Sequence, residues 1–182
     1  MKKYTQKEFN SFEIIDGRRI CPPGDYSLIT NFGEKCSFGE WCYFGDGQRF
    51  GEKCSFSEWC NFGRDCNFGR DCSFGERCNF DERCSFGEWC SFGEKCSFSG
   101  LCSFGELCSF ENKGFGNKIL QIRAGSAYRT STAFYLDTGI YIRSGCFFGT
   151  LEEFEARVEK THGDNIHGKT YKLWCEIIRI NK

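Results

Sequence analysis

The sequence predicts a β-solenoid, a coil of short strands and turns, followed by a small α+β unit. Three observations predict this fold class. The 182 residues have a biased composition, with 21 Phe, 15 Cys and 22 Gly against one Met and two Pro. Phe occurs at every sixth position from 32 to 110, and a Cys lies four residues after almost every Phe. The repeat stops near residue 115, where the composition changes.

The repeat unit is F-G-E-x-C-S, as in residues 32–37. Six is a multiple of the strand period of two, so Phe and Cys lie on the same face of an extended chain. A helix would spread this period around its surface, and each Gly would cost it about 1 kcal/mol. One unit cannot bury its own apolar face, whereas stacked units bury all of them together. We therefore expect Phe and Cys to point inward, and Gly to be required for its backbone angles.

These units resemble the hexapeptide repeat of the left-handed parallel β-helix family. That repeat has an aliphatic residue first, Gly or a small or acidic residue second, and a small residue fifth. Phe, Gly and Cys occupy these positions here. In the family three units make one triangular coil, so the resemblance implies that the fourteen units form about five coils. The SFGExC repeats, followed by residues 145–154, also resemble uncharacterised proteins of gut bacteria and their phages, which implies a phage or mobile-element origin.

Residues 1–25 are expected to form a cap over the first coil. The pattern T-Q-K-E at residues 5–8 is a capping box, which predicts a short helix carrying Phe9 and Phe12. An uncapped solenoid end presents unpaired strand edges that invite aggregation. The cap therefore has a structural role.

The β-helix is assigned to residues 26–115. Before the first regular unit, Tyr26 and Thr30 fit the inward places of an additional unit, and Ile20 lies one step further back. At the other end Phe115 comes one residue earlier than the six-residue repeat requires, so we expect the repeat to end there.

Residues 116–182 are expected to form a small α+β domain. A capping box at residues 150–153 predicts a helix, and the last segment, 171–180, is either a helix or a strand. D-T-G at 137–139 predicts a hairpin turn between the last two strands. The predicted strands are 118–123, 133–137 and 140–143.

The periodic cysteines have three possible roles. The fifth position needs a small apolar side chain, and Cys is among the most often buried residues. Columns of thiolates could instead hold a soft metal, although metal sites use shorter paired spacings. Disulfides between coils are also possible, because the spacing of neighbouring strands lies within the Cα–Cα range of a disulfide. We expect reduced, buried thiols, with no metal site and no cofactor.

The left-handed β-helix family includes acyltransferases, so the resemblance implies that an enzymatic role is possible. In those enzymes a His acts as general base. The repeat region contains no His, and the two in the chain, His162 and His167, follow it. His162, which ends a predicted helix, is explained by the helix dipole. We therefore assign no catalytic residue, and the alternative is an acyltransferase-like enzyme that uses one of these two histidines.

Apolar side chains at outward positions are the candidate interaction sites. Trp41 and Trp59 should stack one coil apart, flanked by Glu40 and Glu58, and we interpret these four residues as an intermolecular surface. A contact of the two Trp side chains with the N-terminal segment is the alternative. We expect a second group to dock on the chain's own C-terminal unit: Trp89, Leu101 and Leu107.

The sequence as a whole favours a non-enzymatic binding or scaffold protein. It would present a rigid β-helix surface to a protein partner or to copies of itself, and a phage- or prophage-encoded inhibitor or sponge acting on a host system fits this class. The net charge of −1 gives no support to nucleic-acid binding, and no apolar run is long enough to span a membrane. No secretory signal is visible, so we expect the cytoplasm of a bacterial host.

Overall fold

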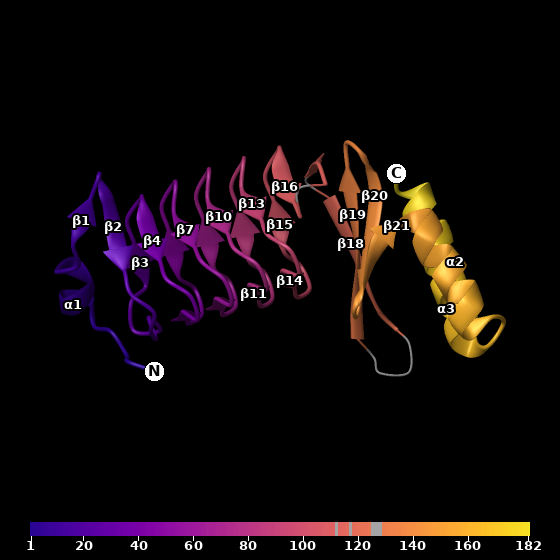
Figure 1. Cartoon of the computed structure of the whole chain (residues 1–182), viewed down its shortest axis with the longest axis horizontal. Helices are drawn as coiled ribbons and strands as arrows, with labels where there is room; N and C mark the ends of the chain where they lie inside the picture. Colours follow the sequence, from indigo (N-terminus) through magenta and orange to yellow (C-terminus); the bar gives the residue numbers. More distant parts are fainter. Residues whose placement is uncertain (112, 117, 125–128) are drawn as a thin grey trace. The chain divides into compact units, whose positions relative to one another are not determined.

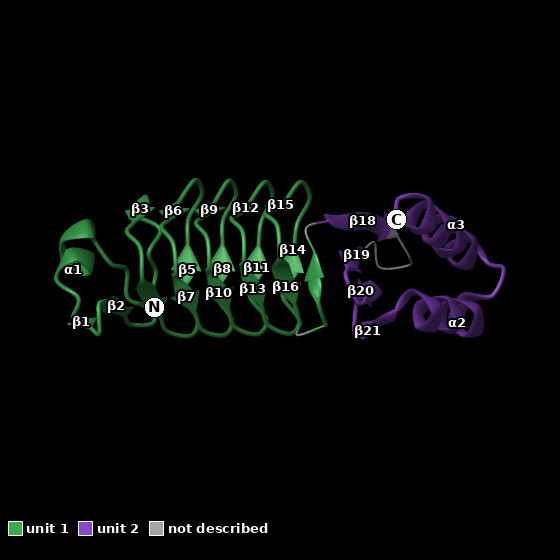
Figure 2. Ribbon diagram, turned by 90° about the horizontal axis from the view of Figure 1, so that it is seen from above, with its two compact units in different colours: residues 1–117 green, residues 118–182 purple. Residues whose placement is uncertain are grey.

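The structure is a computed structural model that describes residues 1–111, 113–116, 118–124 and 129–182. The chain divides into two compact units, Met1–Asn117 and Lys118–Lys182 (Figures 1 and 2). The first unit is a β-solenoid of about five coils, and the second is an antiparallel sheet with two helices. This confirms the predicted fold class. No helix among the described residues is long and apolar enough to cross a membrane.

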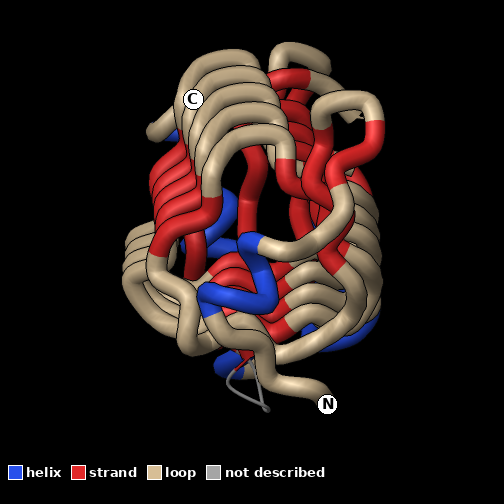
Figure 3. The backbone as a smooth tube through the Cα atoms, turned by 90° about the vertical axis from the view of Figure 1, so that its left-hand side faces the viewer, coloured by secondary structure: helices blue, strands red, loops and turns tan. Residues whose placement is uncertain are grey.

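The solenoid has three sheets, which form the three sides of each coil (Figure 3). The first sheet contains, in spatial order, β1 (Ile14–Ile15), β2 (Arg18–Cys21), β4 (Cys36–Phe38), β7 (Ser55–Phe56), β10 (Ser73–Phe74), β13 (Ser91–Phe92), β16 (Cys108–Phe110) and β17 (Phe115–Gly116). The second contains β14 (Ser97–Phe98), β11 (Asn79–Phe80), β8 (Asn61–Phe62) and β5 (Tyr43–Phe44). The third contains β15 (Ser103–Phe104), β12 (Ser85–Phe86), β9 (Asn67–Phe68), β6 (Arg49–Phe50) and β3 (Asn31–Phe32).

The strands of successive coils pair in parallel, with partners eighteen residues apart, as Phe74 with Phe92. This spacing means that three six-residue units make one coil. Antiparallel pairing occurs at the two ends of the first sheet, between β1 and β2 and between β16 and β17. The chain thus reverses direction at both ends of the solenoid.

The phenyl rings fill the core in two kinds of contact. Along a column the rings are stacked, as Phe56 and Phe74 are, with centroids 5.0 Å apart and planes within 3°. Between columns they meet edge to face, as Phe74 and Phe80 do at 4.9 Å and 89°. Edge-to-face and stacked pairs are the favourable geometries of aromatic rings. The expected inward Phe is therefore confirmed, and it forms a continuous aromatic network.

The corners between the sheets adopt left-handed backbone angles. The fourth residue of each unit has a positive φ, as Lys53 (59°) and Arg77 (57°) show. Such a φ costs a non-Gly residue roughly 1–2 kcal/mol. From Lys35 to Trp89 the N–H of the corner residue donates to the third-position carbonyl of the next coil, as Lys53 does to Arg70 at 2.8 Å. The stacking of coils therefore holds these corners in place.

The second-position Gly has a different role from the one expected. Its φ is not in the left-handed region, so the expected need for special backbone angles is wrong. A β carbon on Gly75 would lie 2.8 Å from the carbonyl carbon of Ser57 and 2.9 Å from the nitrogen of Glu58. The absence of a β carbon at Gly75 therefore accommodates the close approach of the previous coil's backbone.

The N-terminal cap contains α1 (Gln6–Asn10), which begins with both hydrogen bonds of the predicted capping box. Phe9 is buried and meets Phe32 edge to face at 5.2 Å, while Phe12 is half-buried and contacts Tyr4. The helix therefore extends the aromatic core beyond the first coil, as expected.

Two inward places were predicted wrongly near this end. Tyr26 is buried as expected, but Ile29 is buried in place of Thr30, because its N–H closes a tight turn on Tyr26 at 3.0 Å. Ile20 is exposed, and Cys21 is the residue that lies opposite Phe38 in the sheet. The register of the regular units therefore does not continue unchanged into the first coil.

The second unit has a sheet in the order β18 (Lys118–Ala124), β19 (Arg129–Leu136), β20 (Gly139–Ser144) and β21 (Phe147–Thr150), of which β21 was not predicted. It also contains α2 (Leu151–His162), which starts with the predicted capping box. The last segment is a helix, α3 (Ile166–Ile180), which begins after the capping residue Asn165. The core between the sheet and the helices consists of Ala133, Ile142, Leu151, Phe154, Val158, Tyr171, Trp174, Cys175 and Ile178.

The close approach of coils at Gly75 can be tested by Gly75→Val. We expect a loss of about 1–3 kcal/mol in the free energy of unfolding, because the added atoms force two coils apart. Gly33→Val is the matched control, since a β carbon on Gly33 meets no atom within 4 Å. Denaturant unfolding measures both. Equal stability losses in the two variants would contradict the role assigned to Gly75.

Candidate functional site

The two candidate Trp residues, Trp41 and Trp59, occupy the corners that follow β4 and β7. Their φ angles are 59° and 61°, so both side chains leave the coil at the same kind of left-handed corner. The two rings are stacked, with centroids 4.9 Å apart and planes within 4°. The repeat thus brings together two residues that are eighteen positions apart in sequence.

Arg77 continues this stack, and it was not among the predicted site residues. Its guanidinium lies over the Trp59 ring, 4.6 Å from the centroid. Cation–π contacts of this kind are favourable by about 0.5–1 kcal/mol at exposed sites. We call Trp41, Trp59 and Arg77 the aromatic ladder. Trp59, in the middle, is half-buried, whereas Trp41, at the end, is 53 % exposed.

The acidic neighbours of the ladder also hold it in place through their backbone. The N–H of Trp41 donates to the carbonyl of Glu58 at 3.0 Å, and the N–H of Trp59 donates to the carbonyl of Glu76 at 3.0 Å. The side chains of Glu40 and Glu58 are exposed. The ladder therefore stands on a fixed backbone, and an exposed Glu precedes each Trp in the sequence.

The second group of candidate residues also occupies corners, where their φ angles lie between 56° and 65°. The exposed fractions are 48 % for Trp89, 81 % for Leu101 and 43 % for Leu107. The N–H of Trp89 donates to the carbonyl of Glu106 at 3.0 Å, as in the other corners. Docking of the C-terminal unit on these side chains stays a prediction.

The cysteine thiols make a contact that the sequence did not reveal. In the periodic cysteines from Cys54 to Cys108, each Sγ lies 3.2–3.5 Å from the second-position carbonyl oxygen twenty-one residues earlier, on the previous coil. A thiol is a weak donor, so it can supply this carbonyl with a hydrogen bond, which Ala or Val cannot. The residues that make this contact are Cys54, Cys60, Cys66, Cys72, Cys78, Cys84, Cys90, Cys96, Cys102 and Cys108.

Gln48 replaces a cysteine in the periodic column. Its amide is a hydrogen-bond donor on a longer side chain than that of Cys. Its side chain is buried, and Nε2 donates to the carbonyls of Tyr26 at 2.9 Å and Ile29 at 2.6 Å. These carbonyls belong to the irregular turn of the first coil. The longer Gln side chain therefore occurs at the position where the carbonyls of the first coil do not follow the regular repeat.

Burial disfavours the charged form of the buried thiols. The neighbouring Cys78 thiol and burial raise the pKa of Cys96 well above its ordinary value. In the second unit burial raises the pKa of Cys175 to about 12. Since the thiolate is the reactive and metal-binding form, Cys96 and Cys175 are poor nucleophiles and poor ligands at neutral pH. Among the described residues no group of three or more His, Cys, Asp or Glu is placed to hold a metal ion.

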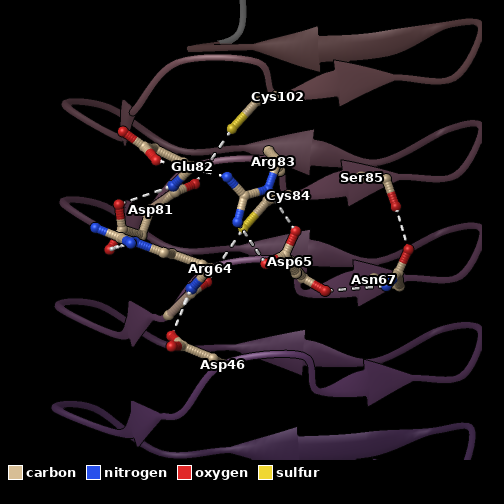
Figure 4. Close-up of polar contacts among 11 residues, drawn as sticks. Asp46, Arg64, Asp65, Asn67, Asp81, Glu82, Arg83, Cys84, Ser85 and Cys102 are labelled. Atoms are coloured by element: carbon tan, nitrogen blue, oxygen red, sulfur yellow. Dashed lines mark hydrogen bonds and ion pairs between the residues drawn. The ribbon is translucent and has the colours of Figure 1, made fainter.

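The outer surface of the solenoid carries polar ladders between coils (Figure 4). Arg83 contacts both carboxylate oxygens of Asp65, at 2.7 and 2.8 Å, and Arg64 lies 3.6 Å from Asp81. The Arg83 hydrogen bonds hold the pKa of Asp65 below its ordinary value. All these groups are exposed, and such pairs contribute little to stability. They make the corner that follows β8 (Asn61–Phe62) and β11 (Asn79–Phe80) polar.

Two cavities are candidate ligand sites. One, of about 140 Å³, lies in the second unit and is lined by His162 and Tyr171 among others. Small-molecule pockets usually measure about 300–1,000 Å³, so this cavity is small for a substrate. The rings of His162 and His167 lie 5.9 Å apart, and the acyltransferase alternative gains no support from this geometry. The other hollow, of about 310 Å³, is a polar groove over β5, β8, β11 and β14.

Comparison of the chain with protein-family models, with curated proteins and with solved structures finds no match. The candidate site therefore depends on the geometry of this chain alone. Within that geometry the aromatic ladder combines exposure with a fixed position.

The packing role of the cysteines can be tested by counting thiols. All fifteen are free; Cys146 is exposed, Cys102 is half-buried and the other thirteen are buried. We expect a thiol reagent to react quickly with Cys146, slowly with Cys102, and with all fifteen after denaturation, because burial protects the rest. Cys146→Ser should remove the fast phase. Fewer than fifteen thiols after denaturation, or bound metal in stoichiometric amount, would contradict this account.

Proposed function

We propose that the protein is a non-enzymatic binding or scaffold protein that uses the aromatic ladder as an anchor for a protein partner. The observation that carries this proposal is the exposure of Trp41 at the end of a stack that the backbone holds rigid. Exposed Trp side chains are enriched among the residues that dominate binding energy at protein interfaces. A fixed anchor also loses little side-chain entropy when it binds.

The charges beside the ladder support a particular kind of partner surface. Glu40 and Glu58 are exposed next to the two Trp rings. Complementary charges at an interface favour the right partner and speed association. The proposed partner surface therefore has an apolar pocket for Trp41 and a basic rim.

Two further parts of this proposal come from the resemblance of the repeat. The first is membership of the left-handed hexapeptide β-helix family, with which parallel strands about six residues apart are compatible. The second is a phage or prophage origin, with an inhibitor or sponge acting on a host system in the bacterial cytoplasm. The abundance of SFGExC units supports this second part.

The proposal is tested with the double variant Trp41→Glu, Trp59→Glu in the full chain. A pull-down from a bacterial host lysate identifies the partner, and its Kd is then measured against parent and variant. We expect the Kd to rise by at least about thirtyfold, because loss of a central aromatic anchor commonly costs 2 kcal/mol or more. The melting temperature should change little, since both side chains lie outside the core.

Trp89→Glu is the matched control, because Trp89 is an exposed Trp at the same kind of corner. It should bind the partner as the parent does. Unchanged binding by the double variant would refute the proposed interface. A collapse of its melting temperature would show that the ladder belongs to the folded core.

A further inference from the structure

Helix α3 is apolar on two faces, only one of which the second unit covers. One face carries Tyr171, Trp174, Cys175 and Ile178, which are buried against α2 and the sheet. The opposite face carries four large aliphatic side chains that are between 48 and 82 % exposed. We call this exposed set the apolar stripe: Ile166, Leu173, Ile177 and Ile180.

The apolar stripe has the spacing of a helix-pairing seam. Together with Thr170 its members follow steps of four, three, four and three residues, which is the heptad pattern of two helices packed side by side. The Thr170 hydroxyl donates to the carbonyl of Ile166 at 2.8 Å, so this side chain needs no outside partner. A surface helix normally carries one apolar face, and a second one of this length marks an interaction site.

The charges along α3 indicate what covers the stripe. Lys172 and Arg179 form ion pairs within the unit, with Glu159 at 2.7 Å and with Glu155 respectively. Lys169 and Glu176 lie seven residues apart along one edge of the stripe, and both are exposed. Neither of these two side chains has an ion-pair partner among the described residues.

We infer that the apolar stripe pairs with the stripe of a second copy of the chain, in antiparallel orientation. In an antiparallel pair, Lys169 lies beside Glu176 of the second copy, and two-fold symmetry makes this pair twice. A parallel pair would instead place Lys169 beside Trp174, which is buried in its own unit. Charge complementarity therefore selects the antiparallel dimer. Such a dimer holds two solenoids together, and it does not depend on the proposed function of the aromatic ladder.

The test is sedimentation equilibrium of the full chain, with charge variants at the edge of the stripe. The parent should be a dimer. Lys169→Glu and Glu176→Lys should each raise the dimer Kd by about tenfold or more, because each places like charges side by side twice. The double swap, Lys169→Glu with Glu176→Lys, should restore the parent Kd to within about threefold, which only antiparallel self-pairing predicts.

A second variant, Leu173→Lys with Ile177→Glu, should raise the dimer Kd by at least about thirtyfold, with unchanged helix content and melting temperature. The Trp41→Glu, Trp59→Glu variant should remain a dimer, which separates this inference from the proposed function. A monomeric parent, a double swap that fails to restore pairing, or cross-links from α3 to the solenoid of the same chain would overturn the inference.

Discussion

The stacking of each phenyl ring on the ring eighteen residues later is the interaction on which the rest of the structure depends. Rings such as Phe62 and Phe80 lie 4.8 Å apart, which is the spacing of neighbouring strands in a sheet. One strand register therefore allows both the ring stacking and the backbone hydrogen bonds between neighbouring strands. A shift of one residue would turn every Phe to the outside. This coincidence of two spacings fixes the coil length, and the coil length places every other residue.

The strained corners follow from the same constraint. A coil of eighteen residues must turn three times, and each turn has a residue with positive φ, which most of the non-Gly residues there disfavour. The cost is offset because the corner N–H bonds to the next coil and because the ring columns are preserved. The corner side chains take no part in the core, so their identity is free to vary. Trp, Leu, Lys, Arg and Asp all occur there, which is why the candidate binding residues are corner residues.

The repeat allowed the interior of the solenoid to be predicted, because every regular unit has a similar unit above and below it. The first coil has a regular unit on one side only, and there the predicted inward positions of Ile20 and Thr30 were wrong. The thiol-to-carbonyl contact could not be predicted, since it joins residues twenty-one apart across two coils. The role of Gly75 was misjudged for a similar reason, because the approach of Ser57 exists only after stacking. The stacking of Trp41 on Trp59 was predictable from spacing, whereas the second apolar face of α3 was visible only once its first face had been placed.

Hydrogen exchange at the corner amides tests the stacked coil most directly. The N–H groups of Lys53, Trp59 and Arg77 lie in turns, yet each donates to a carbonyl of the next coil at 2.8–3.0 Å. NMR-detected exchange on the full chain should therefore show these amides protected as strongly as the amides of Asn61 in β8 and of Gly63 directly after it, because both sets open only when coils separate. Rapid exchange at the corners beside slow exchange in the strands would contradict the account.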